Sequence, residues 1–198
     1  MIRLALLRHG HTAWNRAGRI QGRTDIPLDP AAEVELSTLR LPAPWDAARL
    51  VSSPLLRAQR TAELIAGRSA KLIPELLEMN WGAWEGAMGM ALRADATSGF
   101  RDIEDWGWDF RPPDGESPSD LRNRLAPWAN GLTSDTVAVC HIGIMRVLLA
   151  LATGWNFADT CPFTIKRNRL YIIEISKGQW RMVPEPLRLI QRSEGADP

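Results

Sequence analysis

Short apolar runs recur along the chain and are separated by longer stretches in which apolar and charged residues mix. The runs at 2–7, 50–51, 71–73, 136–140, 170–175 and 180–183 are typical of strands. The run at 136–140 is almost continuously apolar, as expected for a strand that is covered on both faces. Strands that alternate with helical stretches predict a three-layer α/β/α sandwich with a mainly parallel central sheet.

Serine followed by proline marks the start of two predicted helices, one from Ser53-Pro54 to about 65 and one from Ser117-Pro118 to about 130. A third, apolar helix is predicted over 145–152, whereas 78–116 predicts short helices and loops. We expect one domain over residues 1–198, with a frayed tail after Arg192. The glycines that stop the three helices are Gly67, Gly131 and Gly154.

The composition of the chain excludes several classes of function. The 198 residues are 45% hydrophobic and 24% charged, with a net charge of +1, which argues against a general nucleic-acid or membrane surface. Any anion site must therefore be local. The two cysteines, Cys140 and Cys161, cannot form a disulfide framework, and no run is long enough to span a bilayer. The run at 2–7 is too short for a secretion signal, so we expect a cytoplasmic protein.

The three histidines of the chain lie directly after two of the predicted strands. His9 and His11 follow the first strand, and His141 follows the strand at 136–140. Because ligand sites in α/β sheets form at the carboxyl ends of the strands, we expect His9 and His141 to face one site. Arg8 next to the first ring points to an anionic substrate.

These residues are the ones that phosphoryl transfer through a histidine requires. A neutral imidazole at His9 can attack phosphorus, and Gly10 lets the backbone turn and approach a phosphate closely. Arg8 and Arg57 can hold the phosphoryl oxygens, the latter in the first turns of a helix. A carboxyl group kept protonated by apolar surroundings, at Glu78 or Glu85 among tryptophans, can supply the leaving-group proton. Both carboxyl groups belong to the segment Glu78-Met79-Asn80-Trp81-Gly82-Ala83-Trp84-Glu85.

Each of these residues also has an ordinary structural interpretation when it is taken alone. His141 can be a hydrogen-bonded core residue, Arg57 a surface charge, and Glu78 and Glu85 loop acids. Arg146 is expected to cap or pair on its own helix.

Taken together, ordered motifs give the chain a resemblance to the histidine phosphatase superfamily, in its phosphoglycerate-mutase-like branch, over nearly its whole length. The motifs are Leu7-Arg8-His9-Gly10-His11-Thr12, Gln21-Gly22-Arg23-Thr24-Asp25, Ser52-Ser53-Pro54-Leu55-Leu56-Arg57, the segment 78–86, Gly115-Glu116-Ser117, and Val139-Cys140-His141-Ile142-Gly143. Position 11 departs from the family, where glutamate is frequent. A helix after Leu28 that begins with Asp29-Pro30 also departs from the usual threonine start.

The resemblance implies a phosphohistidine at His9, with Glu78 as the acid and base and Glu85 in a lesser role. It implies no cofactor and no metal. The implied catalytic residues are Arg8, His9, Arg57, Glu78 and His141; the implied substrate-binding residues are Arg8, Gly10, Asn15, Gln21, Gly22, Arg57, His141 and Ile142.

Three functions remain open from the sequence. The first is a phosphomonoesterase that hydrolyses a small phosphate ester, with α-ribazole phosphate as one substrate, and releases inorganic phosphate. The second is phosphoryl transfer of the phosphoglycerate mutase type, and the third is a binding member without catalysis. His11 is interpreted as a loop residue or a substrate contact, and Trp106–Phe110 as a substrate wall or as core. The apolar closing strands hint at a homodimer.

Overall fold

A single mixed sheet forms the centre of the molecule. In the computed structural model, which describes residues 1–192, seven strands pair in the order β4-β3-β5-β1-β6-β7, and β8 also pairs with β6. A separate two-stranded sheet joins β2 (Leu39–Arg40) to β9 (Ile190–Gln191). The strands of the main sheet are β1 (Ile2–Arg8), β3 (Arg49–Ser52), β4 (Lys71–Leu72), β5 (Thr136–Cys140), β6 (Arg169–Ser176), β7 (Gln179–Met182) and β8 (Leu187–Arg188).

The strand directions confirm the prediction of a mainly parallel sheet. Strands β4, β3, β5 and β1 pair in parallel, and β6 runs antiparallel to β1. Because β7 and β8 are both antiparallel to β6, they point the same way as β1. Six of the seven strands therefore share one direction, and their carboxyl ends meet at one edge.

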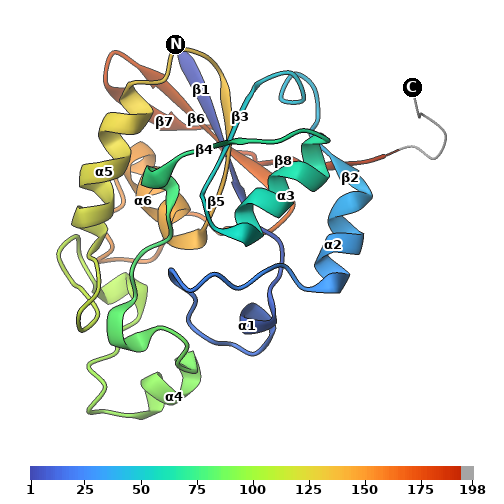
Figure 1. The fold of residues 1–198 in the computed structure, drawn as a ribbon. Helices are drawn as coiled ribbons and strands as arrows, with labels where there is room; N and C mark the ends of the chain where they lie inside the picture. The colour runs from blue at the N-terminus through green and yellow to red at the C-terminus, as the bar shows by residue number, and fades with distance from the viewer. Residues whose placement is uncertain (193–198) are drawn as a thin grey trace.

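Helices cover both faces of the sheet, as the three-layer prediction requires (Figure 1). Helices α2 (Pro30–Ser37) and α3 (Leu56–Ala66) lie on one face, and α5 (Pro118–Asn130) and α6 (Ile142–Thr153) on the other. The side chains of β1 alternate between the two layers: Leu4 and Leu6 pack with α5 and α6, whereas Ala5 and Leu7 pack with α3. Alternation with a period of two is the geometry of a strand, and here both faces are apolar.

The predicted start of α5 is confirmed, but the predicted start of α3 is wrong. Ser117 caps α5 in a capping box with Asp120. Helix α3 begins at Leu56 rather than at Ser53-Pro54, and its N-cap residue, Leu55, makes no side-chain hydrogen bond. The Ser53 hydroxyl oxygen accepts from the Leu55 amide at 3.3 Å, one residue before the helix, and it also contacts a residue of another strand end, described below.

The other helix boundaries follow the glycine signals. Gly67 and Gly154 adopt the left-handed conformation at the ends of α3 and α6, with φ of 64° and 78°. Helix α6 begins at Ile142, three residues before the predicted 145, because His141 in extended conformation serves as its N-cap residue. Asp29 caps α2 by accepting a hydrogen bond from the Ala32 amide, so the unusual Asp-Pro entry forms a regular helix start.

The segment 78–116 forms short helices, as expected, and lies below the carboxyl ends of the strands together with α1 (Ala13–Arg16) in the view of Figure 1. Its helical parts are η2 (Gly82–Trp84), α4 (Gly89–Ala94) and η3 (Ile103–Asp105), preceded by η1 (Pro74–Leu76). Trp106 is buried and packs against Trp81 and Phe110, so the core interpretation of this aromatic stretch holds for that residue.

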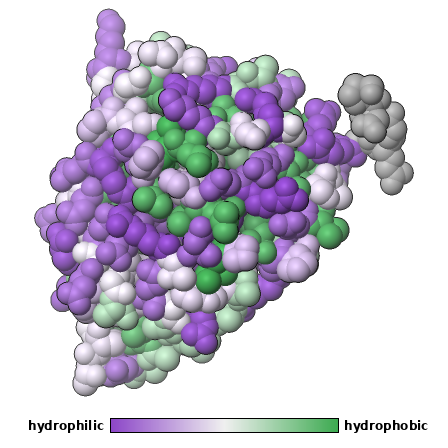
Figure 2. All heavy atoms as spheres, viewed as in Figure 1, coloured by the Kyte–Doolittle hydropathy of each residue, from purple (hydrophilic) through white to green (hydrophobic). Residues whose placement is uncertain are grey.

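The surface in Figure 2 is mostly hydrophilic, with hydrophobic residues gathered around the middle of this face. Leu56 and Leu72, which begin α3 and end β4, are 50% and 44% exposed. Among residues 1–192, no helix is long and apolar enough to cross a membrane. The homodimer and the cytoplasmic location stay predictions, and the predicted frayed tail lies outside the described residues.

Candidate active site

Three adjacent parallel strands each deliver a polar residue to the same edge of the sheet. His9 follows β1, His141 follows β5, and Ser53 follows β3, on the far side of β5. Backbone hydrogen bonds fix these ends, because the His9 amide donates to Cys140 O at 3.0 Å and the Ser53 amide to Val139 O at 3.0 Å. The ring centroids of His9 and His141 lie 5.1 Å apart. The structure thus brings the two distant histidines together.

The His9 ring is held in one tautomer. Its Nδ1 lies 2.7 Å from the carbonyl oxygen of Gly10. A carbonyl oxygen only accepts, so Nδ1 carries the proton and the lone pair is on Nε2. His9 is 3% exposed. The ring therefore presents one fixed nitrogen lone pair, as a nucleophile requires.

The surroundings of His9 also keep the ring neutral. Burial lowers its pKa well below the ordinary 6.5, and the charges of Arg57 and Arg8 lower it further. The bond to Gly10 O acts in the opposite direction but does not outweigh them. The ring is thus unprotonated at neutral pH, which is the form that can attack phosphorus.

Ser53, which sequence analysis interpreted as a helix cap, orients the second histidine. The Ser53 hydroxyl oxygen lies 2.7 Å from Nε2 of His141, and both residues are fully buried. Nδ1 of His141 is buried without a hydrogen-bond partner among residues 1–192. If the Ser53 hydroxyl donates to Nε2, Nδ1 carries a proton that is free to bind a ligand oxygen. The Ser-Pro pair resembles a cap signal, which hid this role.

Arg57 connects helix α3 to the loop that contains Gln21 and Gly22. Its two terminal nitrogens donate to Gly22 O at 2.6 Å and Thr24 O at 3.0 Å. Gly22 has no space for a side chain, because a Cβ atom there would lie 2.9 Å from the Met79 carbonyl oxygen. The guanidinium is fully buried, and its Nε has no partner among residues 1–192. Arg57 therefore both closes this loop and leaves one donor available.

Glu85 holds the same loop from the other side. Its carboxylate accepts from the Thr24 amide at 2.5 Å. Burial alone would raise the pKa of Glu85, but hydrogen bonds from Thr24 and from the amides of Arg23 and Gly22 outweigh it and lower the pKa. Glu85 is therefore ionised and positions the loop, whereas the leaving-group proton must come from elsewhere.

Glu78 has the properties of that proton donor. It is 2% exposed, and burial raises its pKa above the ordinary 4.5 against the effect of hydrogen bonds from the amides of Met79 and Gly143. The carboxyl oxygens lie 2.8 and 3.2 Å from those two amides. A Cβ atom on Gly143 would lie 2.5 Å from the nearer Glu78 oxygen, so only glycine fits there. The start of α6 thus supports the carboxyl group two residues after His141.

A network behind the site fixes the segment that carries Glu78. Arg124 on α5 donates to the backbone carbonyls of Glu75 and Leu77, the latter at 2.8 Å. Glu116 accepts from the Asn80 amide at 2.8 Å and from the Arg23 guanidinium at 2.8 Å. The Gly115-Glu116-Ser117 motif therefore anchors the segment rather than contacting a substrate.

Gly10 is constrained by packing, whereas the sequence predicted only that it lets the backbone approach a phosphate. Its amide donates to the Thr61 hydroxyl at 3.0 Å and is thereby occupied. A Cβ atom at this position would lie 2.7 Å from Leu36 Cδ1. Packing of the first loop against α2 and α3 requires glycine here.

Arg167, which sequence analysis missed, joins the loop that follows His9. It donates to the His9 carbonyl oxygen at 3.2 Å and to Asn15 Oδ1 at 2.9 Å. Asn15 in turn donates to Gln21 Oε1 at 3.1 Å. Arg167 precedes β6 in an ordinary basic stretch, Lys166-Arg167-Asn168, so the sequence carries no signal for it.

The site holds more positive than negative charge and several unused donors. Burial lowers the pKa of Arg8 to about 10, helped by Arg167 and Arg146 and opposed by Glu78. Uncompensated buried charge is costly unless an anion joins it. Within residues 1–192, the buried polar atoms of this cluster that lack a partner are Arg8 Nε, Gln21 Nε2, Arg57 Nε and His141 Nδ1. Of these residues, Arg8 and Arg57 act on the pKa of the neutral His9 ring and His141 lies beside it, as a phosphate site requires. His11, partly exposed, has an unpartnered Nδ1 as well.

Comparison with known proteins identifies the family to which the chain belongs. The family model described as the histidine phosphatase superfamily (branch 1) matches residues 4–184. The chain belongs to this superfamily, and the resemblance given by the sequence motifs is confirmed.

Among curated proteins, the chain is 35% identical over 129 residues to a probable phosphoglycerate mutase GpmB of Erwinia tasmaniensis. A probable phosphoglycerate mutase GpmB of Escherichia coli is 33% identical over 129 residues. Each match covers 63% of this chain, and the chain spans about 60% of the length of these curated relatives.

Solved structures give the same fold over the whole chain. The protein TTHB049 from Thermus thermophilus is 34% identical, with a TM-score of 0.74 and full coverage of both chains. A phosphoglycerate mutase from the same organism is 33% identical with a TM-score of 0.70, covering 96% of this chain and 100% of its own. A mycobacterial glucosyl-3-phosphoglycerate phosphatase has a TM-score of 0.78 at 23% identity, covering 95% and 99%, and shares the fold.

Proposed function

We propose that the protein is a phosphomonoesterase that hydrolyses a small phosphate ester through a phosphohistidine at His9. One observation carries the proposal: the lone pair of His9 Nε2 is held in a buried, cationic cluster beside a carboxyl group, Glu78, whose raised pKa favours the protonated form. The nucleophile and the acid thus have opposite pKa shifts, each in the direction that its task needs.

In the first step, His9 Nε2 forms a bond to phosphorus while the bond between phosphorus and the ester oxygen breaks. Arg8, Arg57 and His141 Nδ1 bind the oxygens of the transferring group, whose charge must be held in the transition state. The Glu78 carboxyl group gives its proton to the departing alkoxide. The products are the free alcohol, an ionised Glu78 and a phosphohistidine.

In the second step, Glu78 takes a proton from a water molecule as that water attacks phosphorus on the side opposite Nε2. The bond between phosphorus and nitrogen breaks, which returns His9 to its neutral form and releases inorganic phosphate. Glu78 is again protonated. No metal or cofactor enters this sequence of steps, and that independence is part of the proposal.

A mutase of the phosphoglycerate type is the second candidate, favoured by the 35% identity to the probable mutase of Erwinia tasmaniensis. Such an enzyme returns the phosphoryl group from histidine to an organic acceptor instead of to water. α-Ribazole phosphate remains one substrate to be tested for the hydrolase, and a non-catalytic binding role is the third candidate.

Two assays separate these functions. Release of inorganic phosphate from p-nitrophenyl phosphate, lost in His9→Ala, supports the hydrolase, whereas no release from any phosphorylated metabolite in a panel that includes α-ribazole phosphate favours the binding role. Interconversion of 2- and 3-phosphoglycerate that depends on a bisphosphate primer, and exceeds hydrolysis, would instead indicate the mutase.

A further inference from the structure

Arg146 on α6 is partly buried, and among residues 1–192 it lacks the partner that sequence analysis expected. Among residues 1–192 its guanidinium makes no hydrogen bond and no ion pair, although burial lowers its pKa. It lies one helical turn after Ile142 and therefore on the same face of α6, beside the N-terminus that follows His141. An unpaired, partly buried cation so close to the proposed reaction centre is available to bind a ligand.

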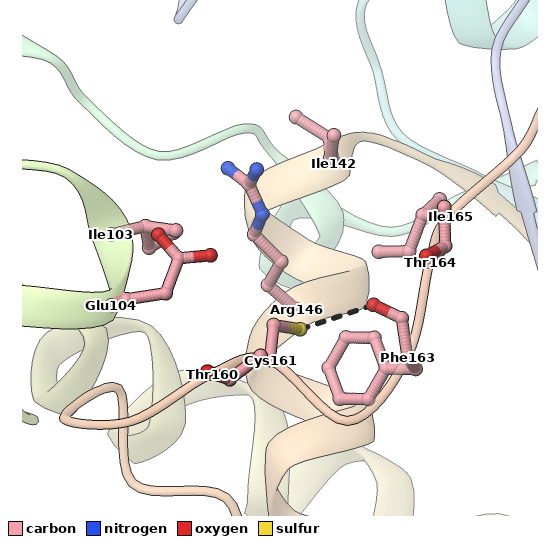
Figure 3. Close-up of a pocket in the computed structure, with 9 residues that line it drawn as sticks. All are labelled: Ile103, Glu104, Ile142, Arg146, Thr160, Cys161, Phe163, Thr164 and Ile165. Carbon is pink, nitrogen blue, oxygen red and sulfur yellow. Dashed lines mark hydrogen bonds between the residues drawn. The ribbon is translucent and has the colours of Figure 1, made fainter.

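The guanidinium faces a cavity of about 320 Å³, which is the size of a small-molecule site. Figure 3 shows Arg146 reaching toward Ile142 and the Glu104 carboxylate pointing toward it from η3. A second cavity of about 350 Å³ shares Ile103, Glu104 and Arg146 with the first, so the two adjoin across these side chains. The remaining lining mixes aromatic side chains, namely Trp81, Phe100, Trp106 and Phe163, with polar ones that include Thr160 and Thr164.

Glu104 is the feature that defines the chemistry of this cleft. It is partly exposed, and no residue among 1–192 pairs with its carboxylate. Of the other charged lining residues, Arg93 pairs with Asp102, and Arg101 lies over the Phe110 ring at 5.0 Å. In the first cavity, therefore, one free guanidinium faces one free carboxylate, while Arg101 adds a positive charge to the second cavity. Such a pair offers donors and acceptors but no net charge.

The position of the cleft assigns it to the alcohol part of the substrate. Ile142 follows His141 directly and lines the first cavity, while Ile20 and Trp81, which line the second, flank Gln21 and the Glu78 segment. The charge of Arg146 lowers the pKa of Arg8, and the charge of Glu78 raises the pKa of Arg146. Arg146 therefore lies near the proposed phosphate site and near the proposed proton donor. An alcohol leaving group that departs from phosphorus toward Glu78 therefore enters this cleft.

We propose that Arg146 and Glu104 select a neutral, hydroxyl-bearing leaving group, such as a polyol, sugar or nucleoside, over one that carries a carboxylate. The proposal rests on the proposed phosphatase function. Hydroxyl groups can donate to Glu104 and accept from Arg146 at once, and the aromatic side chains of the lining can pack against the carbon face of such a group. A carboxylate is attracted by Arg146 but repelled by Glu104, and the repulsion cancels the attraction.

The test compares glycerol 3-phosphate with 3-phosphoglycerate, which differ only in a hydroxymethyl group against a carboxylate. We expect the wild-type protein to have the higher kcat/KM for glycerol 3-phosphate. Glu104→Gln removes the repulsion and should move the ratio of the two kcat/KM values toward 3-phosphoglycerate by roughly tenfold. Arg146→Met keeps the apolar stem and should lower kcat/KM for glycerol 3-phosphate by roughly 10-fold to 100-fold.

Glu63→Gln, on the opposite layer, removes the same charge from an exposed helix position and serves as the matched control for the ratio. The inference is overturned if the wild-type protein prefers 3-phosphoglycerate, or if Glu104→Gln and Glu63→Gln give the same ratio. Hydrolysis of p-nitrophenyl phosphate by the wild-type protein distinguishes a failure of the proposed function from a failure of this inference. If it is absent, the proposed function fails; if it is present without the expected preference, only this inference fails.

Discussion

At the strand ends, the polar side chains are buried and most have a fixed protein partner, whereas in the neighbouring cleft Arg146 and Glu104 have none among residues 1–192. The strand ends belong to the central sheet, whereas the cleft is lined by residues of α4, α6, η3 and loops. Groups that act on the transferring phosphoryl must be oriented in advance, because reorganising them during the reaction raises the barrier. Groups that recognise a leaving group can instead be supplied by surface segments that vary.

The largest expected effect is on the nucleophile. His9→Asn preserves a donor for Gly10 O but removes the attacking nitrogen, so we expect hydrolysis of every substrate to fall by roughly 10⁴-fold or more. Steady-state rates on p-nitrophenyl phosphate and glycerol 3-phosphate measure this, with thermal unfolding to verify the fold. A variant that kept a tenth of the rate would rule out His9 as the nucleophile.

Glu78→Gln should separate the substrates by their leaving groups. The amide cannot donate a catalytic proton, so hydrolysis of glycerol 3-phosphate should fall by roughly 10²-fold to 10⁴-fold. The fall should be smaller for p-nitrophenyl phosphate, whose phenolate leaves unprotonated. Since the pKa of Glu78 is raised, the wild-type kcat/KM should persist above pH 4.5 and decline once pH exceeds that raised pKa. Equal losses on both substrates would contradict the role of acid.

Arg57→Lys keeps the positive charge but removes the forked guanidinium. In the wild-type protein the two terminal nitrogens of that group bind Gly22 O and Thr24 O, and its Nε is left available. We expect a loss of roughly 10²-fold in kcat/KM on all esters, because phosphoryl stabilisation is common to them. The ratio between glycerol 3-phosphate and 3-phosphoglycerate should not change. A changed ratio would mean that the strand ends also select the leaving group.

Gly143→Ala should affect catalysis through Glu78. The new methyl group would lie 2.5 Å from a Glu78 oxygen, so the carboxyl group or the start of α6 must shift. We expect a loss of about 1–3 kcal/mol in the free energy of unfolding, with reduced turnover of glycerol 3-phosphate. Gly131→Ala is the control, since its Cβ atom would come no closer than 3.4 Å to another atom and its φ is −81°. Similar losses in both variants would refute the specific contact.

The last expected effect is on stability, which should depend on pH. The buried rings of His9 and His141 have pKa values well below 6.5, so the unfolded chain binds more protons below that pH. The free energy of unfolding should therefore decrease as pH falls below 6.5, by up to about 1.4 kcal/mol per pH unit for each ring. Denaturant unfolding of wild type and His9→Asn at several pH values tests this, and the variant should show the shallower decline. Parallel curves would mean that His9 titrates normally.

Local sequence signals located the elements and the strand-end histidines with good accuracy. Apolar runs predicted the strands, and the glycines at 67 and 154 predicted the helix ends, because both depend on short-range backbone geometry. The Ser53-Pro54 signal placed the helix start too early, and it did not reveal that the Ser53 hydroxyl meets a partner 88 residues away. Arg167 was missed for the same kind of reason, since its contacts with His9 O and Asn15 are formed only on folding.

The sequence by itself determined the family and the three-layer sheet, and it supplied the residues that we propose carry the chemistry, because ordered motifs and apolar periodicity are properties of neighbouring residues. Only the tertiary structure decided the tautomer of His9, the raised pKa of Glu78 and the isolation of Arg146 opposite Glu104. These properties depend on burial and on which distant groups become partners. Neither can be read from the positions of the residues along the chain.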